Sequence, residues 1–493
     1  MSKLRFLMGL WVGKLSVPAL KVTHHNGTDY PGKLAIKFCP NFLDYIERPK
    51  KLVIVTGTNG KTTVNNMLID ILEDNGIKVF SNRAGSNITT GISTVFIKGS
   101  NIFGKLKKCD MAVLEVDERS APRIYPYLKP DYVLITNLSR DSILRNAHPQ
   151  YIANVLTNAV PENTKMILNA DDLISGNVAP LNARAYFGIN ELPGEKNDDC
   201  DDGENVTGFE RTDNAKDSLL NDMRICPRCA GKLKYNYLRY NHIGNAKCTD
   251  CGFESPNADY AITALDYDNG TMKVKEGNEE YVYPLIADSM FNIYNLITVI
   301  AMGRELGLSH EQLIKSMGKT QIPTSRHSED CVGTIRVITQ MAKEKNASAT
   351  NRAIDYVAKI DGNREMLLMM NCLNDTKHWS ENPCWIYDTD FELLNQEGIK
   401  KIVCAGARNK DYRLRLLMAG VPDERIICCD SELEAAELLS YNPNDIICLF
   451  HGVDSTALAM QVKAKILRLA SIKEKASNGT SGKEKTSDGK GEN

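Results

Sequence analysis

Residues 56–63 read TGTNGKTT, a run of glycine, threonine and lysine with the chemistry of a phosphate-binding turn. Glycines let backbone N–H groups approach phosphate oxygens, a lysine reaches the terminal phosphates, and the hydroxyl that follows it holds Mg²⁺. In this run Lys61 would contact the terminal phosphates and Thr62 the metal ion. We therefore predict that a nucleotide is bound by Gly57, Thr58, Asn59, Gly60, Lys61, Thr62 and Thr63.

The segments on either side of this turn have the periodicities that such a site requires. Residues 52–55 (LVIV) form a continuous apolar run that is typical of a buried strand. Apolar residues then recur at helical spacing from Val64 to Leu72. Val55 stands where the general GxxxxGK[ST] pattern has its first glycine, so the strand and the helix carry as much of the prediction as the motif. The alternative is a chance glycine-rich turn before a helix.

Strand patterns alternate with helical patterns along most of the chain. Short apolar runs at 111–116, 132–136 and 166–169, and later at 365–370 and 401–405, have the composition of buried strands. This alternation predicts an α/β protein with a mostly parallel sheet. At 493 residues, of which 42% are hydrophobic, the chain can form more than one core.

The composition along the chain also suggests where the domains begin and end. We expect a hinge at 321–330, where Pro323 lies in a polar run. The expected parts are an N-terminal segment packed on the ATP domain (1–50), a central ATP-binding domain (51–320), a flexible acidic insert (194–222), a cysteine module (224–256), a C-terminal α/β domain (321–472) and a disordered tail (473–493).

Four cysteines in the middle of the chain have the spacing of a metal site. Cys226 and Cys229 form one CxxC pair, and Cys248 and Cys251 form a second pair after eighteen residues. This spacing is typical of a zinc ribbon, in which four thiolates close the coordination shell of a structural zinc ion. The metal would stabilise a hairpin that lacks a core of its own. A redox pair is the alternative, and His242 is expected to be a loop residue and not a ligand.

Charge and cysteine content exclude some partners and compartments. Lys plus Arg (60) nearly balances Asp plus Glu (62), so no overall positive field favours nucleic acid. Fourteen scattered cysteines fit a reducing compartment, and we expect a cytoplasmic protein. Lys14 interrupts the apolar run 6–12 well before the roughly 20 residues needed to span a bilayer. We expect this first helix to pack on the body, with contact at the inner face of the membrane as the alternative.

The turn and several later segments resemble the Mur ligase superfamily. TGTNGKTT is the form that this turn takes in Mur ligases and folylpolyglutamate synthases, and LEVDE at 114–118, NADD at 169–172 and FNIYN at 291–295 follow in the family's order. The resemblance implies that Glu115 binds Mg²⁺ and that Asn295 lies on the nucleotide side. It also implies that the hinge residue Arg326 contacts an ATP phosphate.

The superfamily resemblance implies an ATP-dependent carbon–nitrogen ligase. ATP would phosphorylate a carboxylate, because a carboxylate oxygen is a poor leaving group, and an amine or ammonia would attack the acyl phosphate. Lys61, Mg²⁺ and Arg326 would neutralise charge on the transferred phosphoryl group.

The cysteine module and the C-terminal segments WIYDTDFE (385–392) and GARNKD (406–411) resemble the MurT family within this superfamily. That resemblance implies amidation of the D-glutamate α-carboxylate of the lipid II stem peptide to D-isoglutamine, in peptidoglycan biosynthesis. Ammonia would come from a separate glutamine amidotransferase subunit resembling GatD. The chain would then be one subunit of a heterodimer.

Such an amidotransferase would need a carboxylate from this chain to complete its Cys-His triad. Asp388 and Asp390 are the candidates. On a strand, alternation would place both side chains on one face, and spacing leaves the choice between them open. Two other functions stay open: a stand-alone Mur-type or folylpolyglutamate-type amino acid ligase, and a non-catalytic scaffold that binds nucleotide and zinc.

Overall fold

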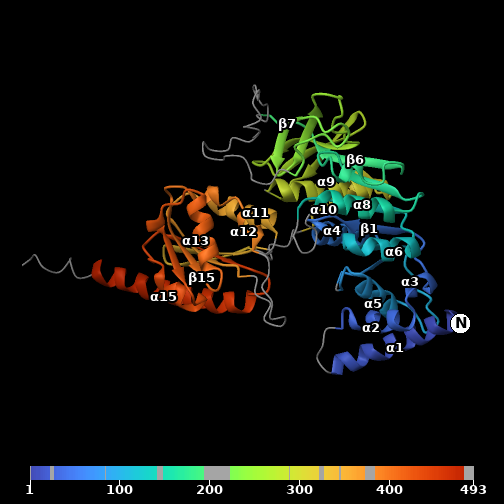
Figure 1. Cartoon of the computed structure of the whole chain (residues 1–493), viewed down its shortest axis with the longest axis horizontal. Coiled ribbons are helices and arrows are strands. Elements are labelled where there is room, and N and C mark those ends of the chain that lie inside the picture. Colours follow the sequence, from blue (N-terminus) through green and yellow to red (C-terminus); the bar gives the residue numbers. More distant parts are fainter. Residues whose placement is uncertain are drawn as a thin grey trace, which may run out of the picture. The chain divides into compact units, whose positions relative to one another are not determined.

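The computed structural model divides into two units, which Figure 1 shows coloured along the chain. Of the described residues, those up to Ser139, 148–193 and 222–320 build the first unit, and Arg140 and those from 327 onward build the second. The structure describes residues 2–22, 27–83, 85–140, 148–193, 222–287, 289–320, 327–342, 346–371 and 383–481.

A nine-stranded sheet organises the first unit, in the order β11-β10-β9-β6-β5-β4-β1-β3-β2. The strands from β2 to β9 in this order pair in parallel, and β9, β10 and β11 pair antiparallel at one edge. Their bounds are β1 Leu52–Thr56, β2 Val79–Ser81, β3 Met111–Glu115, β4 Tyr132–Ile135, β5 Lys165–Asn169, β6 Arg184–Ile189, β9 Tyr260–Asp266, β10 Thr271–Glu276 and β11 Glu279–Pro284.

Helices cover both faces of this sheet, which explains why its central strands carry apolar residues on both faces. Val53 and Val55 of β1 face one core, which is shared with α4 (Lys61–Asp74), α9 (Met290–Glu305) and α10 (His310–Met317). Leu52 and Ile54 face the opposite core. That core is shared with α5 (Thr89–Gly99), α6 (Ala121–Leu128) and α8 (Pro149–Ala159).

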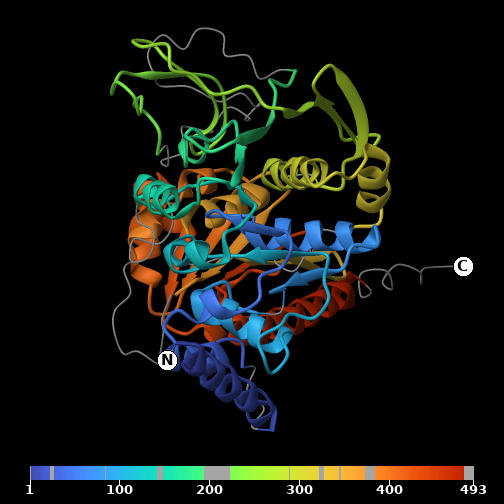
Figure 2. The ribbon, with the colours of Figure 1, turned by 90° about the vertical axis from the view of Figure 1, so that its right-hand side faces the viewer.

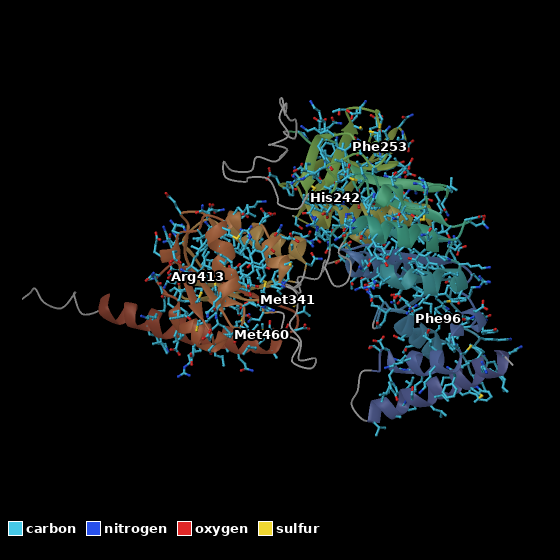
Figure 3. The ribbon with its side chains drawn as sticks, in the orientation of Figure 1. Phe96, His242, Phe253, Met341, Arg413 and Met460 are labelled. Carbon is cyan, nitrogen blue, oxygen red and sulfur yellow. The ribbon has the colours of Figure 1, made fainter. Side chains whose placement is uncertain are left out.

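Three helices precede the sheet: α1 (Ser2–Val22), α2 (Tyr30–Phe38) and α3 (Phe42–Tyr45). The helix α1 packs on α2 and α5, and both views show it at the outer edge of the first unit (Figures 1 and 2). Phe96 of α5, labelled in Figure 3, is completely buried in this layer. Among the described residues, no helix has the length and hydropathy needed to cross a membrane.

The cysteine module lies between β6 and β9 and forms a sheet of its own. Its two antiparallel strands are β7 (Leu233–Tyr240) and β8 (Ile243–Cys248). Cys226 and Cys248 are buried, and they join the apolar core that also contains α6 and α8. The module is therefore attached to the first unit by packing as well as by the chain.

The second unit contains a six-stranded sheet in the order β12-β13-β17-β14-β15-β16. Only β12 runs antiparallel to its neighbour. The bounds are β12 His327–Val332, β13 Ile335–Met341, β14 Arg364–Met369, β15 Ile399–Ala405, β16 Ile426–Cys429 and β17 Ile446–His451. One face packs on α11 (Ala347–Ala358), α12 (Cys384–Tyr387) and α13 (Asn409–Met418), and the other on α14 (Glu432–Ala435) and α15 (Thr456–Ser481).

The α/β class and the mostly parallel sheets are confirmed, and three local expectations need correction. Residues 385–392 are not a strand, because α12 and a 3₁₀ turn at Phe391–Leu394 occupy them. Residues 327–330, expected in a hinge, begin the paired strand β12. The predicted disordered tail starts too early: α15 continues through Ser481, and Glu474 on it accepts the backbone N–H of Thr334 at 3.0 Å. Arg326 and nearly all of the acidic insert lie outside the described residues.

Candidate active site

Two glycines give the phosphate turn its shape. Gly57 has φ +124° and Gly60 has φ +85°, a region that residues with a β-carbon rarely adopt. A β-carbon at Gly57 would overlap the Thr136 hydroxyl, and one at Gly60 would overlap the side-chain oxygen of Asn295. Both positions therefore require glycine for conformation and for space.

The segment that follows β4 holds the turn in place. The N–H of Thr58 donates to the carbonyl of Asn137 at 2.7 Å. The Thr58 hydroxyl donates to the carbonyl of Ser139 at 3.1 Å and accepts the Ser139 N–H at 3.0 Å. The Thr136 hydroxyl donates to the carbonyl of Asn59 at 2.6 Å. The backbone of the turn is thus fixed by protein contacts alone.

The start of α4 lies at the end of this turn and can receive an anion. Gly60 occupies the N-cap position, and in the described part of the chain no side chain caps the helix. The N–H groups of the first helical turn, including those of Thr62 and Thr63, have no partner within the helix and carry the positive end of its dipole. This is the arrangement that binds phosphate at helix N-termini.

Lys61 is held beside the turn by a buried carboxylate. Its Nζ lies 2.8 Å from Oε1 of Glu118, whose side chain is 1% exposed, and it also donates to the carbonyl of Gly57. Burial lowers the pKa of Lys61, but Glu118, Glu115 and Asp117 together outweigh burial and raise the pKa, so the amine stays charged. Glu118 also accepts the N–H of Gly57 at 3.0 Å. Sequence reasoning missed Glu118, because an acid after a strand gives no sign of which side chain it will meet.

Thr62 and Glu115, both predicted to hold Mg²⁺, are brought together. The Thr62 hydroxyl donates to Oε2 of Glu115 at 2.8 Å, and the Asn87 amide donates to Oε1 at 2.8 Å. Asn82 fixes the backbone of Glu115 through two hydrogen bonds, of 2.8 and 2.9 Å. A hydroxyl and a carboxylate are ligands that Mg²⁺ accepts, so the residues present fit this ion. The two asparagines were not predicted, since isolated polar loop residues carry no pattern.

Asn295 lies on α9 and faces the same turn. It is 2% exposed, its Oδ1 abuts Gly60, and its Nδ2 donates to Asn292 at 3.2 Å. The predicted nucleotide residue therefore lies next to the phosphate turn. Its proposed companion Arg326 lies outside the described residues.

The four cysteines of the module form one cluster, with all ligand atoms within 4.8 Å of one another. The Sγ atoms of Cys226 and Cys251 are 3.6 Å apart, and those of Cys229 and Cys248 are 3.4 Å apart. Tetrahedral zinc with Zn–S bonds of about 2.3 Å separates its sulfurs by about 3.8 Å. The cluster therefore fits a four-thiolate zinc ion.

Backbone N–H groups also favour thiolates in this cluster. Hydrogen bonds from the N–H groups of Cys251 and Asp250 lower the pKa of Cys248 to about 7. Gly231 similarly stabilises the Cys229 thiolate, but the neighbouring thiols outweigh this effect and raise the pKa of Cys229 to about 12. Four thiols so close together cannot all ionise without a cation, which is what a bound metal ion supplies.

The consecutive carboxylates Asp171 and Asp172 hold the inner end of the module. Asp171 accepts the hydroxyls of Tyr237 on β7 (3.0 Å) and Tyr294 on α9 (2.6 Å), and it pairs with Arg239 on β7 at 3.3 Å. Asp171 belongs to the NADD segment, which resembles a nucleotide-side motif of the superfamily, and in the structure it connects the cysteine module to α9.

Asp172 connects the module to the segment that supports the phosphate turn. Its Oδ1 lies 3.0 Å from Nε2 of His242, and its Oδ2 accepts the N–H of Leu138 at 2.7 Å. Burial lowers the pKa of His242, but Asp172, with smaller contributions from Asp222 and the Leu138 backbone, outweighs burial and raises the pKa. The pKa of Asp172 is lowered, because its partners outweigh its own burial. His242, marked in Figure 3, lies in the β7–β8 turn as expected, but it is completely buried and not in a solvent-exposed loop.

In the second unit, the structure separates the two candidate aspartates. Asp390 is buried and exchanges two hydrogen bonds with Asn351, of 2.6 and 2.9 Å. Asp388 follows the end of α12, and its side chain is 29% exposed. Buried Arg415 fixes this segment by donating to the carbonyl of Thr389 at 2.7 Å. Asp388 is therefore the accessible carboxylate of the two.

Comparison with known proteins identifies relatives of both units. Residues 55–191 match the Mur ligase middle domain family, and residues 344–451 match the MurT ligase C-terminal family. The chain is 29% identical over 439 residues to the lipid II isoglutaminyl synthase (glutamine-hydrolyzing) subunit MurT of Staphylococcus aureus, covering 87% of this chain and 92% of that protein. The corresponding Streptococcus pneumoniae subunit is 28% identical over 430 residues, covering 86% and 89%.

The fold is also found among solved structures. A pseudomurein peptide ligase type C from Methanothermus fervidus superposes with a TM-score of 0.62 at 20% identity, covering 88% of this chain and 84% of that chain. A MurF structure from Acinetobacter baumannii gives a TM-score of 0.58 at 14% identity, covering 88% and 80%. At these identities the likeness concerns the fold.

Proposed function

The chain belongs to the Mur ligase superfamily, with a C-terminal domain of the MurT type, and from this premise we propose that it is the ligase subunit of a lipid II isoglutaminyl synthase. Mur ligases are ATP-dependent ligases that use Mg²⁺. The proposed substrate is the D-glutamate α-carboxylate of the lipid II stem peptide. The proposed product is D-isoglutamine, made with ammonia from a partner amidotransferase.

The proposed reaction has two steps. A carboxylate oxygen takes the terminal phosphoryl group of ATP, which gives an acyl phosphate and ADP. Ammonia then attacks the carbonyl carbon, phosphate leaves, and the nitrogen loses a proton. Phosphoryl transfer of this kind depends mainly on positioning and on electrostatic stabilisation.

The residues of the first unit have distinct proposed roles in this reaction. The N–H groups from Gly57 to Thr63 and the start of α4 hold the phosphates, and Lys61 neutralises the group being transferred. Thr62 and Glu115 hold Mg²⁺, which lowers the negative charge on the phosphates when bound. Asn295 contacts the nucleotide from α9. The observation that carries the proposal is that charged Lys61 and the Thr62–Glu115 pair lie at the uncapped helix start.

Asp388 is the proposed contribution to the partner's active site. A carboxylate that orients an imidazole in another subunit has to be accessible on the surface of its own subunit. Asp388 pairs loosely with Arg140 at 3.5 Å but keeps a side chain that is 29% exposed, so it meets this requirement, whereas Asp390 is buried and bonded to Asn351. The zinc ion bound by Cys226, Cys229, Cys248 and Cys251 has a structural role in this proposal, because four thiolates leave no position for a substrate.

Reconstitution with a glutamine amidotransferase and lipid II tests the function and the role of Asp388 together. Asp388→Asn is expected to lower glutamine-dependent amidation by about 10⁴-fold, the cost of losing the orienting carboxylate of a triad. Amidation from added ammonium should stay at the wild-type rate. Asp423→Asn, an exposed aspartate of the same unit paired with Arg413, is the matched control.

Three outcomes separate the proposal from its alternatives. If Asp390→Asn abolishes glutamine-dependent amidation and Asp388→Asn does not, Asp390 is the carboxylate that completes the triad. ATP turnover with an amino acid and without any partner would identify a stand-alone ligase. Absence of acyl phosphate with every stem peptide offered would favour a scaffold.

A further inference from the structure

Helix α1 is apolar on two opposite sides, and among the described residues of the first unit only one of these sides is packed against other elements. On the inner side Phe6 and Leu10 are buried. Gly9 lies against the backbone of Ala35, and Gly13 lies against Pro31 and Ile97. A helix that is apolar all round is normally enclosed by protein or lipid. The outer side of α1 therefore requires an explanation.

The outer side carries a regular row of exposed apolar side chains. Leu4, Met8, Trp11, Leu15 and Val22 are 63%, 43%, 44%, 72% and 80% exposed. Their spacing of i, i+4, i+7, i+11 and i+18 places all five on one side of the helix. Single exposed apolar residues are ordinary, but a continuous row marks an interaction surface.

The loop after α5 extends this row. The Trp11 indole N–H donates to the carbonyl of Ile102 at 2.8 Å, so the loop lies directly beside the helix. Ile102 and Phe103 are 56% and 66% exposed. We call the outer row of α1 together with Ile102 and Phe103 the N-terminal face.

The segments that form and flank the N-terminal face are strongly basic. Residues 2–22, 30–38 and 98–108 contain nine exposed Lys or Arg and no Asp or Glu, although acidic residues outnumber basic ones in the whole chain by 62 to 60. Lys105, Lys107 and Lys108 follow directly after Phe103. These three segments are therefore locally basic around the exposed apolar row, with Asp29, Glu47 and Asp110 on the adjoining segments.

We propose that the N-terminal face binds the surface of an anionic lipid bilayer. Apolar side chains flanked by lysines are the pattern of segments that lie in the membrane interface, where apolar burial and attraction to anionic headgroups act together. The absence of acidic residues from the three segments complements a negatively charged surface. The helix lies on the bilayer and does not cross it, in agreement with its hydropathy. This inference does not depend on the proposed function.

Vesicle co-sedimentation of the full-length, zinc-loaded chain, with and without the proposed amidotransferase, tests the inference. Vesicles of phosphatidylglycerol and phosphatidylcholine in equal parts are compared with vesicles of phosphatidylcholine alone. We expect binding to the anionic vesicles at least about tenfold tighter, and weaker binding in high salt. The combined variant Leu4→Ser, Leu15→Ser and Phe103→Ser should lose at least about tenfold in affinity for the anionic vesicles.

Charge and control variants complete this experiment. Lys105→Gln with Lys107→Gln and Lys108→Gln should weaken binding to anionic vesicles by about a hundredfold, and change binding to neutral vesicles little. The control combines Leu181→Ser, Tyr267→Ser and Val282→Ser, three exposed apolar residues elsewhere in the same unit, and should bind like wild type.

The results that overturn the inference are equally specific. The inference is wrong if the wild-type chain does not bind anionic vesicles. It is also wrong if the serine variants keep vesicle binding but lose binding to the amidotransferase or self-association. Thermal unfolding of each variant checks that the fold is kept. MgATP affinity in solution should be the same for all of them, and its absence in wild type would count against the proposed function and not against the lipid surface.

Discussion

The phosphate turn and the cysteine module lie in the same unit, but protein contacts hold the turn, whereas the module needs a metal ion. In the turn, Thr58, Lys61 and Thr62 already have protein partners in Ser139, Glu118 and Glu115. In the cysteine cluster, the four sulfurs are close to one another, and their other hydrogen bonds are from backbone N–H groups of their own loops. The turn is formed before its ligand arrives, whereas the outer end of the module depends on its metal ion.

The two regions are nevertheless connected through one buried residue. Asp172 pairs with His242 at the inner end of the module and also holds the N–H of Leu138. Leu138 lies between Asn137 and Ser139, both of which contact the turn. The inner end of the module is therefore expected to behave as part of the nucleotide domain, and the outer end as a metal-dependent addition.

Removal of zinc should give the largest difference between the two regions. Structural zinc binding is worth about 10–16 kcal/mol in isolated ribbons, so chelation or Cys248→Ser with Cys251→Ser should expose the cysteine end of the hairpin. Hydrogen exchange there should accelerate by on the order of a hundredfold or more, and exchange in β1 and α4 should change far less. Metal analysis should find one zinc ion per chain.

The exposed Cys331, outside the cluster, provides a matched control for this experiment. Cys331→Ser should retain zinc and leave the exchange pattern unchanged. If chelation accelerates hydrogen exchange equally in β1 and in the cysteine cluster, the phosphate turn depends on zinc as much as the module does.

Asp172→Asn should give the next largest effect, a loss of unfolding free energy at the inner end of the cysteine module. The substitution leaves a buried imidazole without its charged partner, and breaking such a pair costs about 3–5 kcal/mol of unfolding free energy. Urea unfolding of the first unit measures this cost. Asp266→Asn, on the surface of the same unit, should cost much less. A loss below about 1 kcal/mol for Asp172→Asn would show that the inner end is not held through this residue.

His242→Gln should give the smallest effect, with a defined pH dependence. The pKa of His242 is raised in the folded protein, so the stability that its charge provides is fully present below the ordinary value of about 6.5. It is lost as the pH rises through the folded pKa. The difference in unfolding free energy between wild type and variant should therefore be larger at pH 6 than at pH 9. A difference that grows with pH would contradict a charged His242–Asp172 pair.

The strand, turn and helix around the phosphate turn could be predicted from the sequence because their determinants are contiguous. A strand, two glycines, a lysine and a helix lie within a short segment, and the four cysteines are defined by spacing alone. Glu118 and the true roles of Asp171 and Asp172 depend on contacts with residues far away along the chain, which no local pattern encodes. The same holds for Asn87.

The incorrect predictions also have physical causes. The comparison of Asp388 with Asp390 assumed a strand, but the side chains of Arg415 and Asn351 bind this segment and hold it in short helical turns. The Lys- and Ser-rich composition after residue 472 suggested disorder. The helix α15 continues there, and its Glu474 is bound by Thr334. In both cases tertiary contacts override a weak local preference.

Calorimetric titration of MgATP into the zinc-loaded chain, with and without its amidotransferase, tests the central claim most directly. Wild type should bind, and Lys61→Ala should lose about tenfold to a hundredfold in affinity, the value of charged hydrogen bonds to phosphate, and all ATP turnover. If wild type shows no affinity for MgATP in either state, the turn at Gly57–Thr63 is not a nucleotide site and the proposed ligase activity is wrong.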